Sequence, residues 1–307
     1  KKIERDRNFK KILKEFKPGA VLLDRISKVG KKVIEQNIPL LILLRGNYWE
    51  ESSWAKKTIY KSRIKRLAAT KNEELFDLCL RKSSLILPIS KYLENEVKKR
   101  YPEKNIELFP ADGRDPKEWF PITAQKLKHP CVGLLQDANH WAKTKEMLVL
   151  ETVIEKMPDV NFYWAGDGKF KNRILPRLDK FKNFHWLGPL QYPDKVKDFL
   201  TEIDVYALLT GGDTTPLSLK EAQLMEIPVL ATDFGGIPEI MSDGTTGYLV
   251  KKGDSIDLIK KISALLNDKK LSKEMGESGR KFIQKEFSLE ASAKNFLDII
   301  KPYMKKQ

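Results

Sequence analysis

Short apolar runs alternate with helix-length polar stretches along most of the chain. These runs lie at 20–23, 39–44 and 84–88, and again at 131–135, 161–165, 205–209 and 228–232. Continuous apolar runs separated by polar helices are typical of a parallel sheet that is buried on both faces. The pattern therefore predicts repeated βα units, with a helix at 146–156 between two of the strands.

A stretch rich in Pro, Gly and Asp separates the two groups of runs. It reads FPADGRDP at 109–116 and is followed by a second Phe-Pro pair at 120–121, which marks a linker. We therefore expect two doubly wound, Rossmann-like α/β domains that face a cleft, with ligands bound beyond the carboxyl ends of the strands. The expected domains are residues 1–118 and residues 119–290, followed by a C-terminal helix at 291–307.

The charge of the chain is concentrated near its start. The net charge is +15 over 307 residues, but residues 1–100 hold 26 Lys and Arg against 12 Asp and Glu. The remaining residues hold 31 against 30. This asymmetry indicates an acidic partner for the first domain, such as anionic lipid, a phosphorylated acceptor or nucleic acid; a lysine-rich surface that only aids solubility is the alternative.

Other features of the composition narrow the class of protein. The two cysteines are far apart in the sequence and lack metal-binding spacing, so we expect neither a disulfide framework nor a zinc site. This cysteine usage fits a reducing compartment, and we expect the protein in the cytoplasm. His129, His140 and His185 show no ligand spacing either. The longest apolar run, at 38–44, is too short to span a bilayer, and no signal peptide is visible. The chain starts at Lys1 rather than Met, which leaves open a preceding segment.

Residues 47–68 mix aromatic and basic side chains. Trp54, Tyr60, Ile64 and Leu67 are expected on one face of a basic amphipathic helix. Such a helix can lie on an anionic membrane, or it can pack on its own domain with its lysines in water. Nucleic acid is a third possible partner, but no recognition motif accompanies the pattern.

Residues 211–240 carry the clearest chemistry in the chain. Thr215 is expected to cap a helix that has Pro216 in its first position and ends near Met225. The amides at such a helix start have no intrahelical partners, so together with the helix dipole they form a site suited to a phosphate. Glu221 lies one turn further on, where a carboxylate can accept hydrogen bonds from a ribose diol, and Asp213 lies before the helix.

This segment resembles the retaining, nucleotide-sugar-dependent glycosyltransferases of the GT-B fold, known as the group 1 family. Their signature is an acid, seven residues and then Glu-Ala, and Asp213 with Glu221-Ala222 has that spacing. Further matching stretches are PVLAT at 228–232, GGIPE at 235–239, GTTGYLV at 244–250, AGDG at 165–168, LG at 187–188 and the linker DGRDP at 112–116. The resemblance is strong over about 130–250, looser over 75–125 and weak before residue 75.

The resemblance implies a role for each of these residues. Glu221 is expected to hold the donor ribose, and Asp213 with Lys145 is the expected catalytic pair. A lysine here stabilises the charge that builds on the departing nucleoside diphosphate, so neither a metal nor a cofactor is expected. The other expected donor-binding residues are Lys143, a close alternative to Lys145, and Thr214, Thr215, Pro216, Leu217, Ser218, Gly133, Gly166, Gly188 and Leu190.

The family also implies a reaction and its partners. A sugar would pass from a donor of the UDP or GDP type to an acceptor, with retention at the anomeric carbon. Arg45 and Asn47 are expected on the acceptor side, and the C-terminal helix is expected to return to the N-terminal domain. The basic first domain favours a lipid-linked or anionic acceptor, with the protein peripheral on the inner face of the membrane. No nucleic acid is expected as a partner.

The chain also departs from the family pattern. Leu134 stands where the family has a loop Arg, Asp213 replaces a Glu, and Thr215-Pro216 replaces an aromatic-glycine pair. The N-terminal domain is short or truncated. Two alternatives therefore stay open: a protein that binds nucleotide sugars without turnover, and a protein that binds nucleic acid through its basic third.

Overall fold

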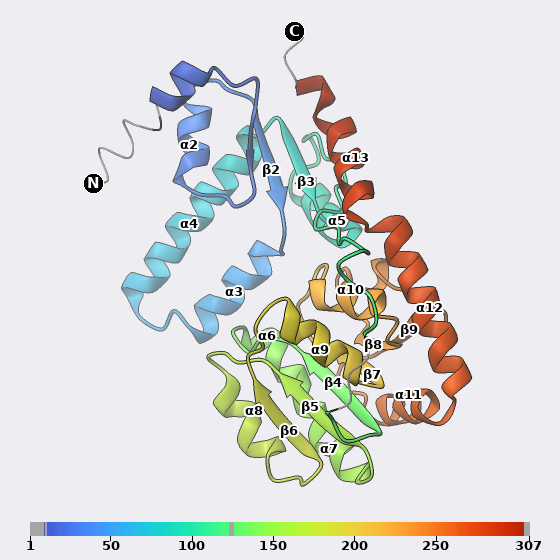
Figure 1. Cartoon of the computed structure of the whole chain (residues 1–307). Coiled ribbons are helices and arrows are strands. Elements are labelled where there is room, and N and C mark those ends of the chain that lie inside the picture. The colour runs from blue at the N-terminus through green and yellow to red at the C-terminus, as the bar shows by residue number, and fades with distance from the viewer. Residues whose placement is uncertain (1–8, 10, 123–125, 304–307) are drawn as a thin grey trace. The chain divides into compact units, whose positions relative to one another are not determined.

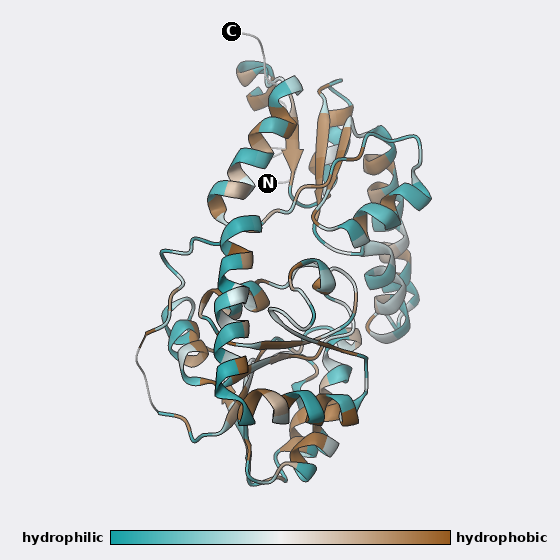
Figure 2. Cartoon of the chain, turned by 90° about the vertical axis from the view of Figure 1, so that its right-hand side faces the viewer, coloured by the Kyte–Doolittle hydropathy of each residue, from teal (hydrophilic) through white to brown (hydrophobic). Residues whose placement is uncertain are grey.

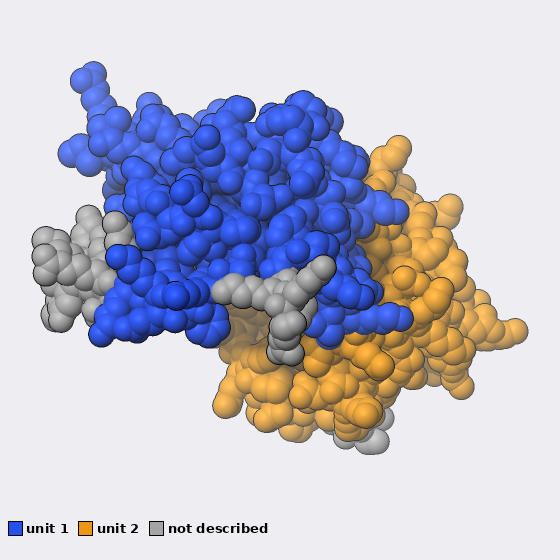
Figure 3. Space-filling model, turned by 90° about the horizontal axis from the view of Figure 1, so that it is seen from above, with its two compact units in different colours: residues 1–111, 293–307 blue, residues 112–292 orange. Residues whose placement is uncertain are grey.

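The computed structural model describes residues 9, 11–122 and 126–303. The chain divides into two compact units: unit 1 is Lys1–Ala111 with Ala293–Gln307, and unit 2 is Asp112–Ser292 (Figure 3). The linker residues 112–118, which we assigned to the first domain, thus belong with unit 2. Trp119, which follows the linker, is buried in a hydrophobic cluster of unit 2. Its burial there explains why the linker belongs with unit 2.

Unit 1 is built on a parallel sheet of three strands in the described residues. They are β1 (Val21–Leu23), β2 (Leu40–Leu44) and β3 (Leu85–Pro88), in that order (Figure 1). Leu22 pairs with Leu41, and Ile42 pairs with Ile86. All residues of β2 and β3 are buried, so their apolar runs are covered on both faces, as a parallel sheet requires.

Helices cover this sheet with their apolar faces. They are α2 (Lys28–Ile34), α3 (Tyr48–Thr58), α4 (Arg63–Lys82) and α5 (Lys91–Arg100). Phe76, Cys79 and Leu80 of α4 belong to the core of the unit. The end of α13 (Leu289–Ile300) and the 3₁₀ turn η3 (Lys301–Tyr303) belong to it as well, and Phe296 contacts Phe109 with ring centroids 5.3 Å apart.

The prediction of a single amphipathic helix at 47–68 was wrong, because two helices, α3 and α4, share this segment. The chain leaves the helical conformation after α3, and Ser62 begins α4 by accepting a hydrogen bond from the Lys65 amide at 3.3 Å. Trp54 and Ile64 therefore lie on different helices and share no helical face. Tyr48 and Trp49 of α3 pack against Phe76 of α4, which shows that tertiary contacts compete with one continuous helix.

Unit 2 contains a six-stranded parallel sheet in the order β6-β5-β4-β7-β8-β9 (Figure 1). Its strands are β4 (Cys131–Leu135), β5 (Asn161–Ala165), β6 (Phe184–Gly188), β7 (Val205–Leu208), β8 (Val229–Thr232) and β9 (Gly247–Val250). The chain proceeds outward from β4 to β6, then returns and proceeds outward from β7 to β9. The strand order therefore reverses between β4 and β7, the type of point at which open α/β sheets bind ligands.

Helices and 3₁₀ turns cover both faces of this sheet. They are α6 (Trp141–Thr144), η1 (Lys145–Val149), α7 (Leu150–Lys156), α8 (Lys171–Leu178), α9 (Asp194–Glu202), α10 (Leu217–Leu224), η2 (Ile237–Glu239), α11 (Ser255–Asn267) and α12 (Lys269–Glu286). The helix expected at 146–156 thus begins as a 3₁₀ turn and is α-helical only from Leu150. Val132 and Phe162 point into the core on one face, and Cys131 and Tyr163 into that on the other.

Hydropathy follows this architecture, because the strands are hydrophobic along much of their length while the helices are hydrophilic on one side (Figure 2). Within the described part of the chain, every helix is too short or too polar to cross a membrane.

Candidate functional site

Most of the predicted donor-binding residues gather at one edge of the sheet of unit 2. Lys143 follows β4, Gly166 follows β5, Leu190 follows β6 and Asp213 follows β7. Since all these strands are parallel, their carboxyl ends meet at the same edge. The loop after β7 packs tightly there: a Cβ on Gly211 would lie 2.4 Å from the carbonyl oxygen of Ala142.

Helix α10 begins at this edge, but not as expected. Pro216, with φ −62° and ψ 128°, is the N-cap, and Leu217 is the first helical residue. Thr215 therefore does not cap the helix, because proline's own extended backbone takes that position. The hydroxyl of Thr215 is instead buried and has no hydrogen-bond partner among the described residues. An unpaired buried hydroxyl costs about 1–3 kcal/mol, so this position favours a ligand with a polar group.

The start of α10 leaves amides available for such a ligand. Its first amides, including those of Leu217 and Ser218, lack intrahelical acceptors and lie at the positive end of the helix dipole. The Ser218 hydroxyl lies 2.7 Å from the hydroxyl of Tyr206, a fully buried residue of β7. The side chain of Ser218 is thus fixed by the sheet, and its amide is the part available to an anion.

Asp213 is held by two side chains. Its Oδ1 accepts a hydrogen bond from Lys143 Nζ at 2.5 Å, and its Oδ2 accepts one from the Thr210 hydroxyl at 2.7 Å. The structure thus brings Lys143, rather than Lys145, to the first acid of the motif. Lys145 is 52% exposed and its nearest ion pair is with Glu146, at 3.7 Å.

Glu221 lies one turn into α10 and is almost fully buried. Its Oε1 accepts hydrogen bonds from Arg114 Nε at 2.9 Å and from the Tyr192 hydroxyl at 3.3 Å. Burial raises the pKa of Glu221 above its usual value, and the neighbouring Arg114 opposes that rise. Sequence reasoning missed Arg114 and Tyr192 as neighbours of Glu221, although Arg114 stands within the linker motif that the family resemblance highlighted.

Two of the three predicted glycines lie where a side chain would not fit. Gly133 lies inside β4, where a Cβ would meet Ile203 at 2.6 Å and Phe199 at 2.9 Å. Gly166, at φ 155°, approaches the carbonyl oxygen of Gln136 so closely that a Cβ would lie 2.0 Å from it. Gly188, at φ 72°, has open space where a Cβ would be. Gly133 is therefore placed against α9, away from the carboxyl edge.

Several neighbours of these residues are also placed by the structure. Leu134 is fully buried in the core, and Gln136 instead occupies the exit of β4, hydrogen-bonded to both backbone groups of Leu209. Leu190 packs partly buried against a hydrophobic cluster. Thr214 lies between Asp213 and Thr215 in the loop before α10.

The two acceptor-side candidates belong to unit 1. Arg45 forms an ion pair with Asp24. Asn47 caps α3, where its Oδ1 accepts a hydrogen bond from the Glu50 amide at 3.1 Å and its Nδ2 donates one to the Tyr92 hydroxyl at 2.7 Å. Asn47 therefore has a structural role that its sequence position alone did not reveal.

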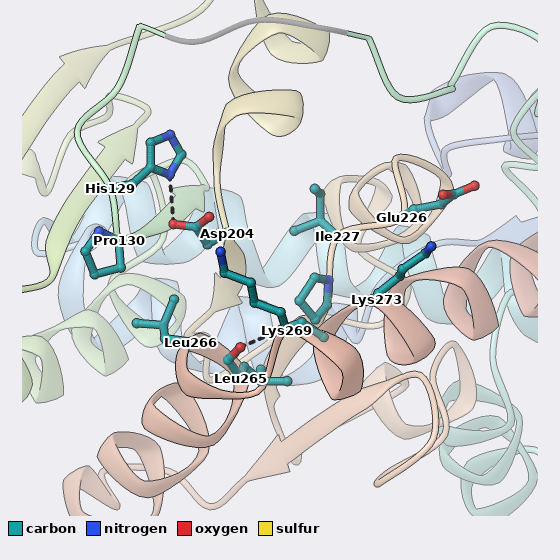
Figure 4. A pocket seen from close by; sticks show the side chains of 11 residues that line it. His129, Pro130, Asp204, Glu226, Ile227, Leu265, Leu266, Lys269 and Lys273 are labelled. Atoms are coloured by element: carbon teal, nitrogen blue, oxygen red, sulfur yellow. Dashed lines mark hydrogen bonds and ion pairs between the residues drawn. The ribbon is translucent and has the colours of Figure 1, made fainter.

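A pocket of about 610 Å³ lies at the opposite edge of the unit 2 sheet (Figure 4). His129, Pro130 and Asp204 line it beside the amino ends of β4 and β7, and Lys269 and Lys273 of α12 line it from the other side. The pocket is thus separate from the predicted donor-binding residues, and its lining mixes both charges.

His129, Cys131 and Asp204 have ligand atoms within 4.8 Å of one another. Asp204 Oδ2 already accepts hydrogen bonds from the Cys131 amide at 2.7 Å and contacts His129 Nδ1 at 2.9 Å. Burial raises the pKa of the Cys131 thiol to about 12, which disfavours the thiolate that a metal needs. These contacts join the starts of β4 and β7 and account for the cluster without an ion.

The two parallel sheets define an α/β protein, and α10 begins at the switch point between β4 and β7 with amides that lack intrahelical acceptors. Residues 131–268 match the family model "Glycosyl transferases group 1". This part of the chain is therefore similar to a glycosyl transferases group 1 domain. This match includes every predicted donor-binding residue, from Gly133 to Glu221.

Known proteins are similar to this chain in part of their sequence or in their fold. Sulfoquinovosyl transferase SQD2 of Arabidopsis thaliana is 30% identical over 144 residues, which are 46% of this chain and 28% of that protein. The chain therefore spans little more than a quarter of that relative's length. Sucrose-phosphate synthase from Thermosynechococcus elongatus has a similar structure, with a TM-score of 0.77 and 18% identity over 96% of this chain and 76% of the other. HepE of Anabaena, solved with UDP and glucose, gives a TM-score of 0.67 at 15% identity over 89% of this chain and 74% of the other.

Proposed function

We propose that the protein is a glycosyltransferase that takes its sugar from a nucleoside diphosphate donor of the UDP or GDP type. The observation that carries this proposal is the edge at the β4–β7 switch point. There Asp213, the start of α10 and the carboxylate of Glu221 lie within nine residues of one loop and helix, and Lys143 of α6 forms an ion pair with Asp213. The similarity to HepE, which was solved with UDP, supports the same donor class.

Each part of this edge has a distinct chemical task. The amides of Leu217 and Ser218 hydrogen-bond the diphosphate, and Lys143 moves from Asp213 to the diphosphate when the donor binds. Positive charge there stabilises the departing nucleoside diphosphate as the glycosidic bond breaks, so we propose that transfer needs no metal. Asp213, released from Lys143, accepts hydrogen bonds from hydroxyls of the transferred sugar.

The test is a panel of UDP-, GDP-, ADP- and dTDP-sugars, with release of nucleoside diphosphate and the thermal midpoint both measured. We expect one nucleotide class to raise the midpoint and to be turned over, with no loss of rate in EDTA. In Lys143→Met the release should fall by about 100-fold or more, as for the loss of a preorganised charge. Lys145→Met is the control, and its rate should stay within about threefold of wild type because Lys145 is paired outside the site.

Other outcomes distinguish the alternatives. A raised midpoint without any release, across acceptors, would favour a protein that only binds nucleotide sugars. We propose retention of configuration on the family resemblance, and proton NMR of the glycoside formed on the acceptor tests it: the donor's anomeric configuration is expected in this product, and an inverted one would exclude retention.

We further propose that unit 1 contacts an anionic membrane, where a lipid-linked or anionic acceptor would lie. Residues 55–72 contain seven Lys and Arg and no Asp or Glu. At the start of α4, residues 61–68 are all exposed, and among them Ile64 is 82% and Leu67 59% exposed. Apolar side chains surrounded by cations suit the interface of an anionic bilayer, so we propose peripheral binding at the inner face of the membrane.

A further inference from the structure

The two carboxylate oxygens of Glu221 differ in their hydrogen bonds. Both of its hydrogen bonds, from Arg114 and from Tyr192, go to Oε1. Oε2 has no hydrogen-bond partner among residues 9, 11–122 and 126–303. The side chain of Glu221 is 4% exposed and that of Arg114 is 17% exposed. The pair is therefore largely shielded from solvent, unlike a surface ion pair.

The backbone around Arg114 is held on both sides. Its amide donates a hydrogen bond to the carbonyl oxygen of Phe287 at 2.9 Å, and its carbonyl oxygen accepts one from the Leu289 amide at 3.1 Å. Gly113 lies so close to this segment that a Cβ would meet the Ser288 carbonyl oxygen at 2.5 Å. The guanidinium therefore reaches Glu221 from a fixed backbone, although it comes from the linker.

The pKa of Glu221 also depends on Arg114. Burial raises the pKa of Glu221, while Arg114, Tyr192 and Lys220 lower it, and Arg114 has the largest effect of these three. Tyr206, on the strand beneath α10, is itself fully buried, and its pKa is raised by burial and by Glu221. Arg114 is thus a cation in direct contact with the carboxylate, and it opposes the rise in the pKa of Glu221 that burial causes.

We propose that Arg114 is a positioning residue for donor recognition: it occupies Oε1 of Glu221 and leaves Oε2 as the acceptor for one hydroxyl of the donor ribose. This inference rests on the proposed function, because it assigns the ribose to Glu221. It implies that Arg114 acts on the nucleoside part of the donor and not on the diphosphate, which meets the amides of α10 and Lys143.

The test compares two ligands by calorimetry. The first is UDP or GDP, whichever the wild-type protein binds, and the second is inorganic pyrophosphate, which has no ribose. In Arg114→Met the Kd for the nucleoside diphosphate should rise by about 10–100-fold, as for the loss of a charge-assisted contact, while the Kd for pyrophosphate should stay within about threefold. Arg114→Lys keeps the charge and should recover part of the affinity. Tyr192→Phe removes only the longer hydrogen bond and should cost less than Arg114→Met.

The pH profile separates positioning from mere structural support. Without Arg114 the pKa of Glu221 rises further, so the carboxylate forms only at higher pH. In Arg114→Met the affinity for the nucleoside diphosphate should therefore be lowest at pH 6 and recover towards pH 9. In the wild type the change over this range should be smaller.

Arg280 provides a matched control. It hydrogen-bonds the carbonyl oxygens of Trp119 at 2.8 Å and Pro116 at 3.1 Å, and also that of Leu224, so it joins the linker to α10 without touching Glu221. Arg280→Met should lower the thermal midpoint but not favour one ligand over the other. Equal weakening of both ligands in Arg114→Met, or unchanged binding, would overturn the inference while the proposed function stands. If the wild type bound neither UDP nor GDP, the proposed function would fail first.

Discussion

Thr215 has a hydroxyl that the folded protein leaves unsatisfied at the point where a donor is proposed to bind. Buried hydroxyls normally find a partner, and the exceptions include groups that await a ligand. Thr201, in the last turn of α9, carries the same kind of unpartnered hydroxyl away from the start of α10. The two threonines therefore allow a direct comparison.

Thr215→Val and Thr201→Val should both raise the free energy of unfolding of the ligand-free protein, by about 1 kcal/mol, because each removes an unsatisfied buried group. Only Thr215→Val should also weaken binding of the donor sugar, by roughly tenfold. Chemical denaturation and donor titration measure the two effects. If Thr215→Val bound the donor as tightly as wild type, its hydroxyl would have no part in the site.

At this scale the sequence predicted part of the site. Spacing and resemblance singled out Asp213 and Glu221, which the structure places on either side of the start of α10. They did not reveal that Arg114 contacts Glu221, because 107 residues separate the two in sequence. The choice between Lys143 and Lys145 depends on how the short α6 helix turns, which no local pattern determines.

At the scale of elements, α10 is fixed from behind by α12. Gly276 of α12 lies against Glu226, which follows α10 in the chain. A Cβ on Gly276 would lie 1.9 Å from the carbonyl oxygen of Glu226. Glu226 itself has φ 59°, so this backbone has little freedom to move away. One turn further, a Cβ on Gly279 would meet only the Gln223 side chain, at 3.2 Å.

Gly276→Ala should therefore destabilise the protein by about 1–3 kcal/mol, because backbone must shift to admit the methyl group. Gly279→Ala should be close to neutral, since the side chain of Gln223 can give and alanine gains about 1 kcal/mol of helix propensity over glycine. Thermal unfolding of both variants checks this difference. Equal stability of the two would show that α10 and α12 are not held at Gly276.

The apolar runs predicted seven of the nine strands in the described residues, because strands of a parallel sheet that are buried on both faces are apolar throughout. They did not include β6 and β9, the two outer strands of the unit 2 sheet, whose middle residues are partly exposed. Helix boundaries were harder. The break between α3 and α4 has one local signal, the cap at Ser62, and depends otherwise on Tyr48 and Trp49 packing against Phe76. The 3₁₀ turn before α7 has no side-chain cap in the structure, so no capping residue announced it.

At the scale of the whole molecule, the charge asymmetry that the sequence showed now has a location. The start of α4 presents Arg63, Lys65 and Arg66 around two exposed apolar residues. If this surface binds anionic lipid, three of its cations should contribute about 1 kcal/mol each near the membrane surface. The binding should weaken with salt, because such charges are screened within about 10 Å at 0.1 M.

Vesicles with and without anionic lipid test this surface. Replacing Arg63, Lys65 and Arg66 by Gln should reduce retention on anionic vesicles by about 100-fold at low salt. The matched control replaces the exposed Lys270, Lys273 and Lys285 of α12 by Gln, which removes the same charge from unit 2 and should change retention much less. Wild-type protein that stays unbound at low salt would exclude the membrane proposal, and tighter retention on RNA or DNA would favour a nucleic-acid partner.

The measurement that tests the central claim most directly is calorimetric titration of UDP and GDP into the wild-type protein and into Glu221→Gln at pH 8. The account predicts that one of the two nucleotides binds the wild type. It predicts that Glu221→Gln weakens this binding by roughly 10–100-fold, since a hydrogen bond to a charged group contributes about 1.5–3 kcal/mol. Failure of both nucleotides to bind the wild type, or equal binding to the variant, would contradict the assignment of this edge as the donor site.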